Sequence, residues 1–364
     1  MKIKLNKALF LEKLILSSHF IATRISSIQT LQGVLVKIEK ETLQLFSTNL
    51  SSYFHTSMKI KNGETNTFLI EPKKIIEYLN YLSEQEVELG IEEKGIVISS
   101  GKTRGKFPLM KNEDFPHLPT ISAEKQKIKT EFLNQNLPLI LFSASSDETR
   151  PGLSGVNFLS NDELIIVSTD GFRLSLVKAK KEIKFPSMLI PADFLRELLQ
   201  YIKEAGETLF SYSEKEKMVS FKIEEDEFFS RLIDEDFPPF EKVIPSEKKT
   251  TIKLEKEDFL RNIKLISVFA RELSNVVILE TDEKGVTIYA KNTGEDDNKT
   301  VQDAQVEGEK QRIAFNFKFL LEFLVTTKGK TVTIEVLRSD APVVFKVDSN
   351  PDFLHIIMPV RVQE

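Results

Sequence analysis

The chain contains no cysteine, and histidine occurs only four times in its 364 residues. Without cysteine, neither a disulfide nor a thiolate metal site can form. The histidines are scattered at His19, His55, His117 and His355, without the spacing of metal ligands. The sequence also has no glycine-rich phosphate loop and no nucleophile elbow. It therefore implies no cofactor and no catalytic residue.

Long apolar runs and an excess of positive charge are also missing. No run approaches the length of a membrane span, and Met1–Phe10 lacks the layout of a signal peptide. We expect a cytoplasmic protein without a membrane partner. The 50 basic and 55 acidic residues give a net charge of −5. This argues against tight DNA binding through a broad basic surface, although it allows a protein that encloses DNA and touches it weakly.

Similar landmarks occur three times in the same order, about every 116 to 125 residues. The period is far longer than a solenoid unit, so each repeat is a whole domain. We predict domains at 1–121, 122–246 and 247–364. The first and last landmarks of the repeats read Lys2-Ile3-Lys4, Lys127-Ile128-Lys129 and Ile252-Lys253-Leu254, then Asp114-Phe115-Pro116, Asp236-Phe237-Pro238 and Pro351-Asp352-Phe353.

Each repeat reads as a strand, a helix, several strands, a second helix and several more strands. Two helices with about eight strands predict an α+β domain. Pro72 and Pro191 suit the first turn of a helix, where a missing N–H costs nothing. The expected helices are Ala8–Thr23, Pro72–Leu82, Glu131–Ala144, Pro191–Ala205, Lys256–Glu272 and Phe317–Thr327. Alternating apolar residues predict hairpins at Val87–Ser99, Thr208–Ile223 and Thr331–Val347.

Charge differs between the repeats. Residues 1–121 carry 16 basic and 13 acidic groups, a net charge of +3. Residues 122–246 carry 16 and 22, a net charge of −6, and residues 247–364 carry 18 and 20, a net charge of −2. The six expected helices together hold 10 basic and 10 acidic groups, so the rest of the chain carries the net charge of −5. The helices are therefore the better place to look for a surface that faces phosphates.

Four segments are more specific: Asp147–Val156 (DETRPGLSGV), Ser168–Leu174 (STDGFRL), Ser230–Pro245 (SRLIDEDFPPFEKVIP) and Met358–Val362 (MPVRV). They resemble the bacterial DNA polymerase III beta subunit, or β sliding clamp, family. The resemblance covers essentially the whole chain. It implies a non-catalytic processivity factor of DNA replication, built from three repeated clamp domains with two helices packed on antiparallel sheets in each. A head-to-tail homodimer would then form a six-domain ring around duplex DNA.

The resemblance also implies a surface that faces DNA. Arg24 and Lys73 match basic inner-surface positions of the family; ordinary solvated charge is the alternative for each. In the second repeat, Ala192 and Asp193 stand where the family often has basic residues. Contacts there are expected to be weaker, or to be made by Arg196 and Lys203.

A second implied site is a pocket between the second and third domains, which would bind short peptides of the replicative polymerase, the clamp loader and repair polymerases. Its aliphatic side chains and flexible methionine suit a cleft, and its arginines suit the polar ends of a peptide. Phe172 departs from the histidine common in the family. Carried over by position, the pocket contains Arg150, Leu153, Thr169, Gly171, Phe172, Arg173, Leu174, Pro238, Val243, Pro342, Ile356, Met358, Pro359, Val360 and Arg361.

The dimer contact implied by the resemblance joins Phe107 and Leu109 to Leu273 of a second copy. Two alternatives stay open at this point. Asp147-Glu148 and Asp234-Glu235-Asp236 could hold Mg²⁺ for a nuclease, although solvated loop charge explains them as well. A monomeric three-domain peptide-binding scaffold would have the mass of one chain, 41.7 kDa, rather than of two.

Overall fold

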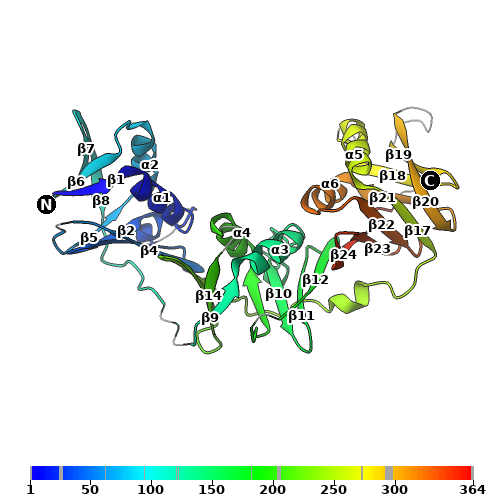
Figure 1. The fold of residues 1–364 in the computed structure, drawn as a ribbon, viewed down its shortest axis with the longest axis horizontal. Helices are drawn as coiled ribbons and strands as arrows, with labels where there is room; N and C mark the ends of the chain where they lie inside the picture. Colours follow the sequence, from blue (N-terminus) through cyan, green and yellow to red (C-terminus); the bar gives the residue numbers. More distant parts are fainter. Residues whose placement is uncertain are drawn as a thin grey trace. The chain divides into compact units, whose positions relative to one another are not determined.

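The computed structural model describes residues 2–23, 28–61, 63–93, 95–119, 121, 123–181, 183–202, 206–271, 274–291 and 298–361. These residues form six α-helices and 24 β-strands (Figure 1). The elements repeat three times in one order: a strand, a helix, four strands, a second helix and three strands. The predicted α+β repeat is thus confirmed, and each repeat has two helices and eight strands.

The bounds of the elements follow the three repeats. The first repeat contains β1 (Lys2–Asn6), α1 (Lys7–Ser18), β2 (Val34–Glu39), β3 (Thr42–Thr48), β4 (Ser52–Lys59), β5 (Asn66–Ile70), α2 (Pro72–Tyr81), β6 (Glu86–Glu92), β7 (Gly95–Ser100) and β8 (Thr103–Met110). The second contains β9 (Gln126–Lys129), α3 (Thr130–Leu141), β10 (Gly155–Ser160), β11 (Leu164–Thr169), β12 (Arg173–Ala179), β13 (Met188–Pro191), α4 (Ala192–Tyr201), β14 (Glu207–Ser213), β15 (Met218–Ile223) and β16 (Asp226–Arg231). The third contains β17 (Thr250–Glu255), α5 (Lys256–Ala270), β18 (Val276–Thr281), β19 (Gly285–Ala290), β20 (Lys299–Gly308), β21 (Arg312–Asn316), α6 (Phe317–Thr326), β22 (Thr331–Val336), β23 (Val343–Val347) and β24 (Asn350–Ile357).

Helices begin where a strand ends in a capping residue or a proline. Asn6 accepts a hydrogen bond from the Leu9 N–H at 2.9 Å and caps α1. Asn316 caps α6 in the same way, because a short polar side chain can satisfy an N–H that has no partner inside the helix. Pro72 occupies the first turn of α2 as predicted. Pro191 does not: it is the last residue of β13, immediately before α4.

The strands form two sheets of twelve strands, each continuous across repeats. In one, the order is β1-β6-β7-β8-β5-β2-β3-β4-β16-β15-β14-β9. In the other, it is β13-β10-β11-β12-β24-β23-β22-β17-β20-β19-β18-β21. The chain accordingly divides into two compact units: unit 1 is residues 1–130 and 200–232, and unit 2 is residues 131–199 and 233–364. The elements of the second repeat are therefore shared between the two sheets.

Two antiparallel seams join strands of different repeats. In unit 1, β4 pairs with β16, with Phe54 opposite Phe228; in unit 2, β12 pairs with β24, with Leu174 opposite Ile356. The Lys13 ammonium on α1 binds Asp226 at 2.6 Å and ties the first repeat to the second. Each seam pairs strands that would otherwise be edges, and exposed edges promote aggregation.

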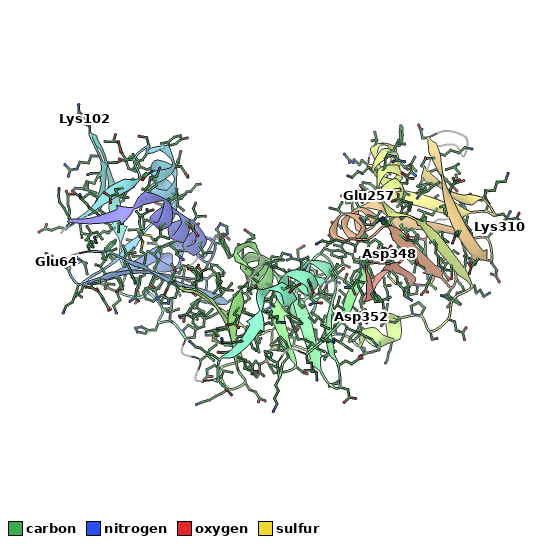
Figure 2. All side chains as sticks on the ribbon, viewed as in Figure 1. Glu64, Lys102, Glu257, Lys310, Asp348 and Asp352 are labelled. Atoms are coloured by element: carbon green, nitrogen blue, oxygen red, sulfur yellow. The ribbon has the colours of Figure 1, made fainter. Side chains whose placement is uncertain are left out.

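Charged side chains occupy the exposed surface of both units. Figure 2 shows Lys102 between β7 and β8, Glu257 at the start of α5 and Asp348 after β23. The core beneath is apolar, with phenylalanines such as Phe10, Phe54 and Phe323 fully buried. No helix in the described part of the chain is both long and apolar enough to span a membrane.

Candidate functional site

A cavity of about 230 Å³ lies in unit 2, next to the seam of β12 and β24. Its walls come from the short 3₁₀ helix η2 (Pro151–Leu153), the turn between β11 and β12, the segment leading into η3 (Phe240–Val243), and the end of β24. The lining residues are Leu153, Thr169, Gly171, Arg173, Leu174, Pro238, Pro239, Phe240, Val243, Ile356 and Met358. An apolar cleft with few polar groups is typical of a binding site.

The turn between β11 and β12 is shaped by side-chain hydrogen bonds. The Thr169 hydroxyl donates to the Arg173 carbonyl at 2.6 Å and accepts from the Gly171 N–H at 3.1 Å. Asp170 Oδ1 accepts from the N–H groups of Phe172 and Arg173 at 2.9 and 3.0 Å. Gly171 has a φ of +91°, a conformation in which other residues are strained. The turn therefore presents a defined edge to the cavity.

The segment after β16 forms the opposite wall. Phe240 is buried against Val167, Leu174 and Ile356, and it lines the cavity together with Leu174 and Ile356. Val243 remains 37% exposed, so it belongs to the cavity wall rather than to the core. Sequence reasoning missed Pro239 and Phe240, although the Phe-Pro-Pro-Phe run was a usable signal: prolines limit the paths of a connector, and its aromatic residues need a partner.

A chain of buried polar side chains lies on the face of the sheet opposite to Leu174 and Ile356. His355 Nδ1 is 2.9 Å from the Ser175 hydroxyl, which is 2.7 Å from the Ser143 hydroxyl. The imidazole stacks on Phe323 with 5.1 Å between ring centres. Burial lowers the pKa of His355 well below its usual value, so the ring is neutral and the seam carries no buried imidazolium charge.

The structure brings nine of the fifteen predicted pocket residues together at the cavity: Leu153, Thr169, Gly171, Arg173, Leu174, Pro238, Val243, Ile356 and Met358. Six do not line it: Arg150, Phe172, Pro342, Pro359, Val360 and Arg361. Arg150 still lies at the rim, because a Cβ on Gly171 would be 3.7 Å from its Nη1. Its Nε donates to Asp147 at 2.9 Å.

The other residues outside the cavity have separate surroundings. Phe172 is 59% exposed, and its carbonyl accepts from the Met358 N–H at 2.8 Å. Val360 packs on Val276, Ile278, Tyr289 and Ala314 of β18, β19 and β21. Pro342 and Pro359 are half-buried, whereas Arg361 is exposed. As peptide contacts, all fifteen residues stay predictions.

The predicted DNA-facing residues differ in their surroundings. Lys73 is exposed at the second position of α2. Arg196 on α4 is partly exposed; it binds Asp193 at 2.5 Å and donates to the Leu141 carbonyl at 2.8 Å. Arg196 thus also holds the end of α3. Arg24 and Lys203 lie outside the described residues.

The predicted dimer residues of the first repeat lie on β8. Phe107 and Leu109 are partly exposed and pack against the core of the repeat, with Phe107 edge-on to Tyr78 at 5.3 Å. Leu273 lies outside the described residues. Just before it, α5 exposes Leu265, Val268 and Phe269, a stripe that sequence reasoning missed. Their i, i+3, i+4 spacing was the available signal.

Models of three consecutive domains match the chain in order. The N-terminal domain of the DNA polymerase III beta subunit matches residues 1–119, the central domain matches 127–239, and the C-terminal domain matches 241–361. The chain belongs to the DNA polymerase III beta subunit family. This confirms the three clamp domains as the fold and the resemblance found in the sequence.

Individual members of this family match over their whole length. A beta sliding clamp of Bacillus subtilis is 27% identical over 353 residues, covering 92% of this chain and 93% of that protein. The crystal structure of a DNA polymerase sliding clamp from Bacillus subtilis has a TM-score of 0.90 at 25% identity and covers 100% of both chains. A sliding clamp of Bartonella birtlesii bound to griselimycin has a TM-score of 0.91 at 23% identity and likewise covers both chains fully.

Members of the DNA polymerase III beta subunit family are non-catalytic processivity factors, so the function is that of a sliding clamp in DNA replication. The prediction of a binding protein rather than an enzyme is confirmed by the family. The nuclease alternative loses its support.

Proposed function

We propose that two copies of this chain close head to tail into a ring around duplex DNA in the cytoplasm, and that the ring tethers the replicative polymerase to its template. Each copy would contribute domains 1–121, 122–246 and 247–364. The observation that carries this proposal is the repeated edge-to-edge pairing of strands, β4 with β16 and β12 with β24. A third seam of the same kind, between copies, would complete a closed ring.

Two partly unpaired strands, one in each unit, are our candidates for the third seam. On β8, residues 103–108 pair only with β7; on β20, residues 299–303 pair only with β19. The unpaired part of β8 carries Arg104 and Lys106, which both bind Glu92 beside it, and the unpaired part of β20 carries Lys299 and Asp303. We propose that these edges pair between copies and that the stripe Leu265, Val268 and Phe269 on α5 is covered in the same contact.

DNA would be held by enclosure, with weak contacts to its phosphates. Lys73, whose ammonium is exposed on α2, supports such a contact. Arg196 supports a second one, because its guanidinium is only partly used by Asp193 and the Leu141 carbonyl. Arg24 and Lys203 belong to the same proposal by position. A few such contacts position a duplex without reading its sequence.

The cavity beside β12 and β24 is the proposed docking site for short peptides of the polymerase, the clamp loader and repair polymerases. Its apolar lining and volume suit two or three aliphatic or aromatic side chains of a peptide. Arg150 at the rim is the exposed cation that could meet a peptide's polar end. We further propose that griselimycin, which the clamp of Bartonella birtlesii binds, occupies this cavity here.

Enclosure predicts that retention depends on DNA topology. The chain should be loaded onto a closed circular plasmid with a clamp loader, separated from free protein by gel filtration, and then exposed to a restriction enzyme that cuts once. We expect the protein to stay with the circle and to leave the linear product, because a ring slides off a free end. Protein that stays on linear DNA with open ends would contradict the proposal.

The pocket proposal predicts that the tail is required for partner binding. Removing residues 358–364 deletes Met358 from the cavity and Val360 from its apolar cluster. We expect primer extension by the polymerase to lose its stimulation, by about tenfold or more, while analytical ultracentrifugation still shows a dimer. Met358→Ala alone should reproduce most of the loss. Asp352→Asn, an exposed change in β24, the strand that leads to Met358 (Figure 2), is the matched control. Undiminished stimulation after the truncation would refute the assignment.

A further inference from the structure

Arg173 lines the cavity, yet its guanidinium is already committed within the protein. The side chain is only 9% exposed. Its Nε donates to Asp170 Oδ2 at 3.0 Å, and its Nη1 donates to Glu322 on α6. The guanidinium carbon lies 4.6 Å from the centre of the Phe319 ring, also on α6. A buried guanidinium needs such partners, so Arg173 is poorly placed to hold a peptide's polar end.

Through Arg173, α6 is linked to two of the segments that line the cavity. One oxygen of Asp170 holds Arg173, while the other accepts two N–H groups of the turn that contains Gly171. In the same turn, the Phe172 carbonyl accepts a hydrogen bond from the Met358 N–H at 2.8 Å. Gly171 and Met358 both line the cavity. A movement of the guanidinium would therefore be transmitted to the turn and to the end of β24.

The first repeat contains the same turn without the arginine. The Thr48 hydroxyl donates to the Ser52 carbonyl at 2.8 Å and accepts from the Leu50 N–H at 2.9 Å. Asn49 accepts from Ser51 and Ser52, as Asp170 accepts from Phe172 and Arg173. Leu50 has a φ of +74°, like Gly171. Local hydrogen bonds are thus sufficient to form the turn in the first repeat, and the link to α6 is an addition at the turn beside the cavity.

We propose that Glu322 and Phe319 on α6 are positioning residues for the peptide pocket, and that they act through Arg173 and Asp170 on the turn around Gly171. The inference rests on the proposed function of the cavity as a docking site. Glu322 is the solvent-accessible partner of the ion pair, because its carboxylate is 48% exposed, whereas Arg173 is buried. A charge-assisted hydrogen bond to a buried arginine is among the stronger polar contacts.

The test compares Glu322→Ala with Glu322→Asp in the full-length dimer. Three quantities are measured: the dissociation constant for griselimycin by calorimetry, amide hydrogen exchange of a peptide spanning 169–173, and the melting temperature. We expect Glu322→Ala to weaken binding by about tenfold and to speed exchange in that peptide. Glu322→Asp should restore part of both effects. Asp258→Ala on α5 is the matched control, since Asp258 is also an exposed carboxylate paired with an arginine, Arg261, at 2.5 Å.

Two results overturn the proposal. One is a lower melting temperature in Glu322→Ala with unchanged affinity and unchanged exchange at 169–173, which would make the link a stabilising contact only. The other is equal effects from Asp258→Ala. If the unaltered protein fails to bind griselimycin, the docking site proposed for that ligand is wrong. The exchange measurement still decides whether Glu322 holds the turn, so the two failures are distinguishable.

Discussion

Glu227 joins three basic side chains at the seam of β4 and β16. His55 Nδ1 lies 3.4 Å from one carboxylate oxygen, and Lys222 and Lys125 lie 2.8 and 3.9 Å from the other. Hydrogen bonds from His55 and then from Lys222 lower the pKa of Glu227 to about 2. The ionised form is thus stabilised by folding. Such a group contributes stability above its unfolded pKa of about 4.5 and loses it as the pH falls toward 2.

We therefore expect Glu227→Gln to destabilise unit 1 by about 2 kcal/mol at pH 7. The difference from the unaltered protein should shrink between pH 4.5 and pH 2, because the unaltered carboxylate becomes protonated there. Urea unfolding followed by circular dichroism at pH 7, 4.5 and 3 measures this. Glu225→Gln, an exposed neighbour, serves as the control. A difference that stays constant across this range would contradict the role of Glu227.

At the same scale, the sequence predicted which residues gather at the cavity better than what each one does. Leu153, Leu174 and Met358 were found because the resemblance places apolar residues by position. The partners of Arg173 were not found, because Glu322 lies 149 residues away and no local pattern links the two. Val360 was assigned to the pocket but packs on Ala314 and its neighbours, because its N–H donates to the Ala314 carbonyl at 2.8 Å and holds the tail against β21.

At the scale of elements, the six helices and three hairpins were predicted because their apolar periodicity is strong. Helix ends were less accurate. The first helix was expected to reach Thr23 but ends at Ser18, and the third was expected to reach Ala144 but ends at Leu141. The apolar pattern continues because Phe20, beyond α1, is buried against Phe54 at 5.3 Å between ring centres. The pattern of buried apolar residues thus continues beyond the last helical hydrogen bond, so apolar periodicity alone cannot locate the end of a helix.

The exposed stripe on α5 predicts where the dimer can be broken. Val268 is 60% exposed in the single chain. Val268→Asp would bury a carboxylate in the proposed contact, which is costly without a partner. We expect sedimentation to show a species near 41.7 kDa instead of twice that mass. Val325→Asp on α6, at a valine that is 64% exposed, should remain dimeric. If both variants remain dimeric, the dimer contact lies elsewhere on the surface.

For the whole molecule, the net charge of −5 and the three-fold repeat support one physical picture. Only the first repeat is net positive, at +3, so few excess cations are available to neutralise phosphates. Every repeat, by contrast, supplies strands to a sheet that continues into another repeat. This balance supports the proposal that DNA is held by a closed path rather than by many ionic contacts.

The salt dependence of retention on DNA distinguishes enclosure by a ring from binding through ionic contacts. A protein bound through six to ten phosphate contacts loses about 10³–10⁵ in affinity between 50 and 200 mM salt. We expect the fraction of this protein retained on closed circular DNA to change by less than about twofold over that range. Lys73→Ala should be retained equally well, because enclosure does not depend on one ammonium group. Sedimentation at both salt concentrations controls for opening of the dimer. If retention falls steeply while the dimer persists, ionic contacts rather than a closed ring hold the DNA.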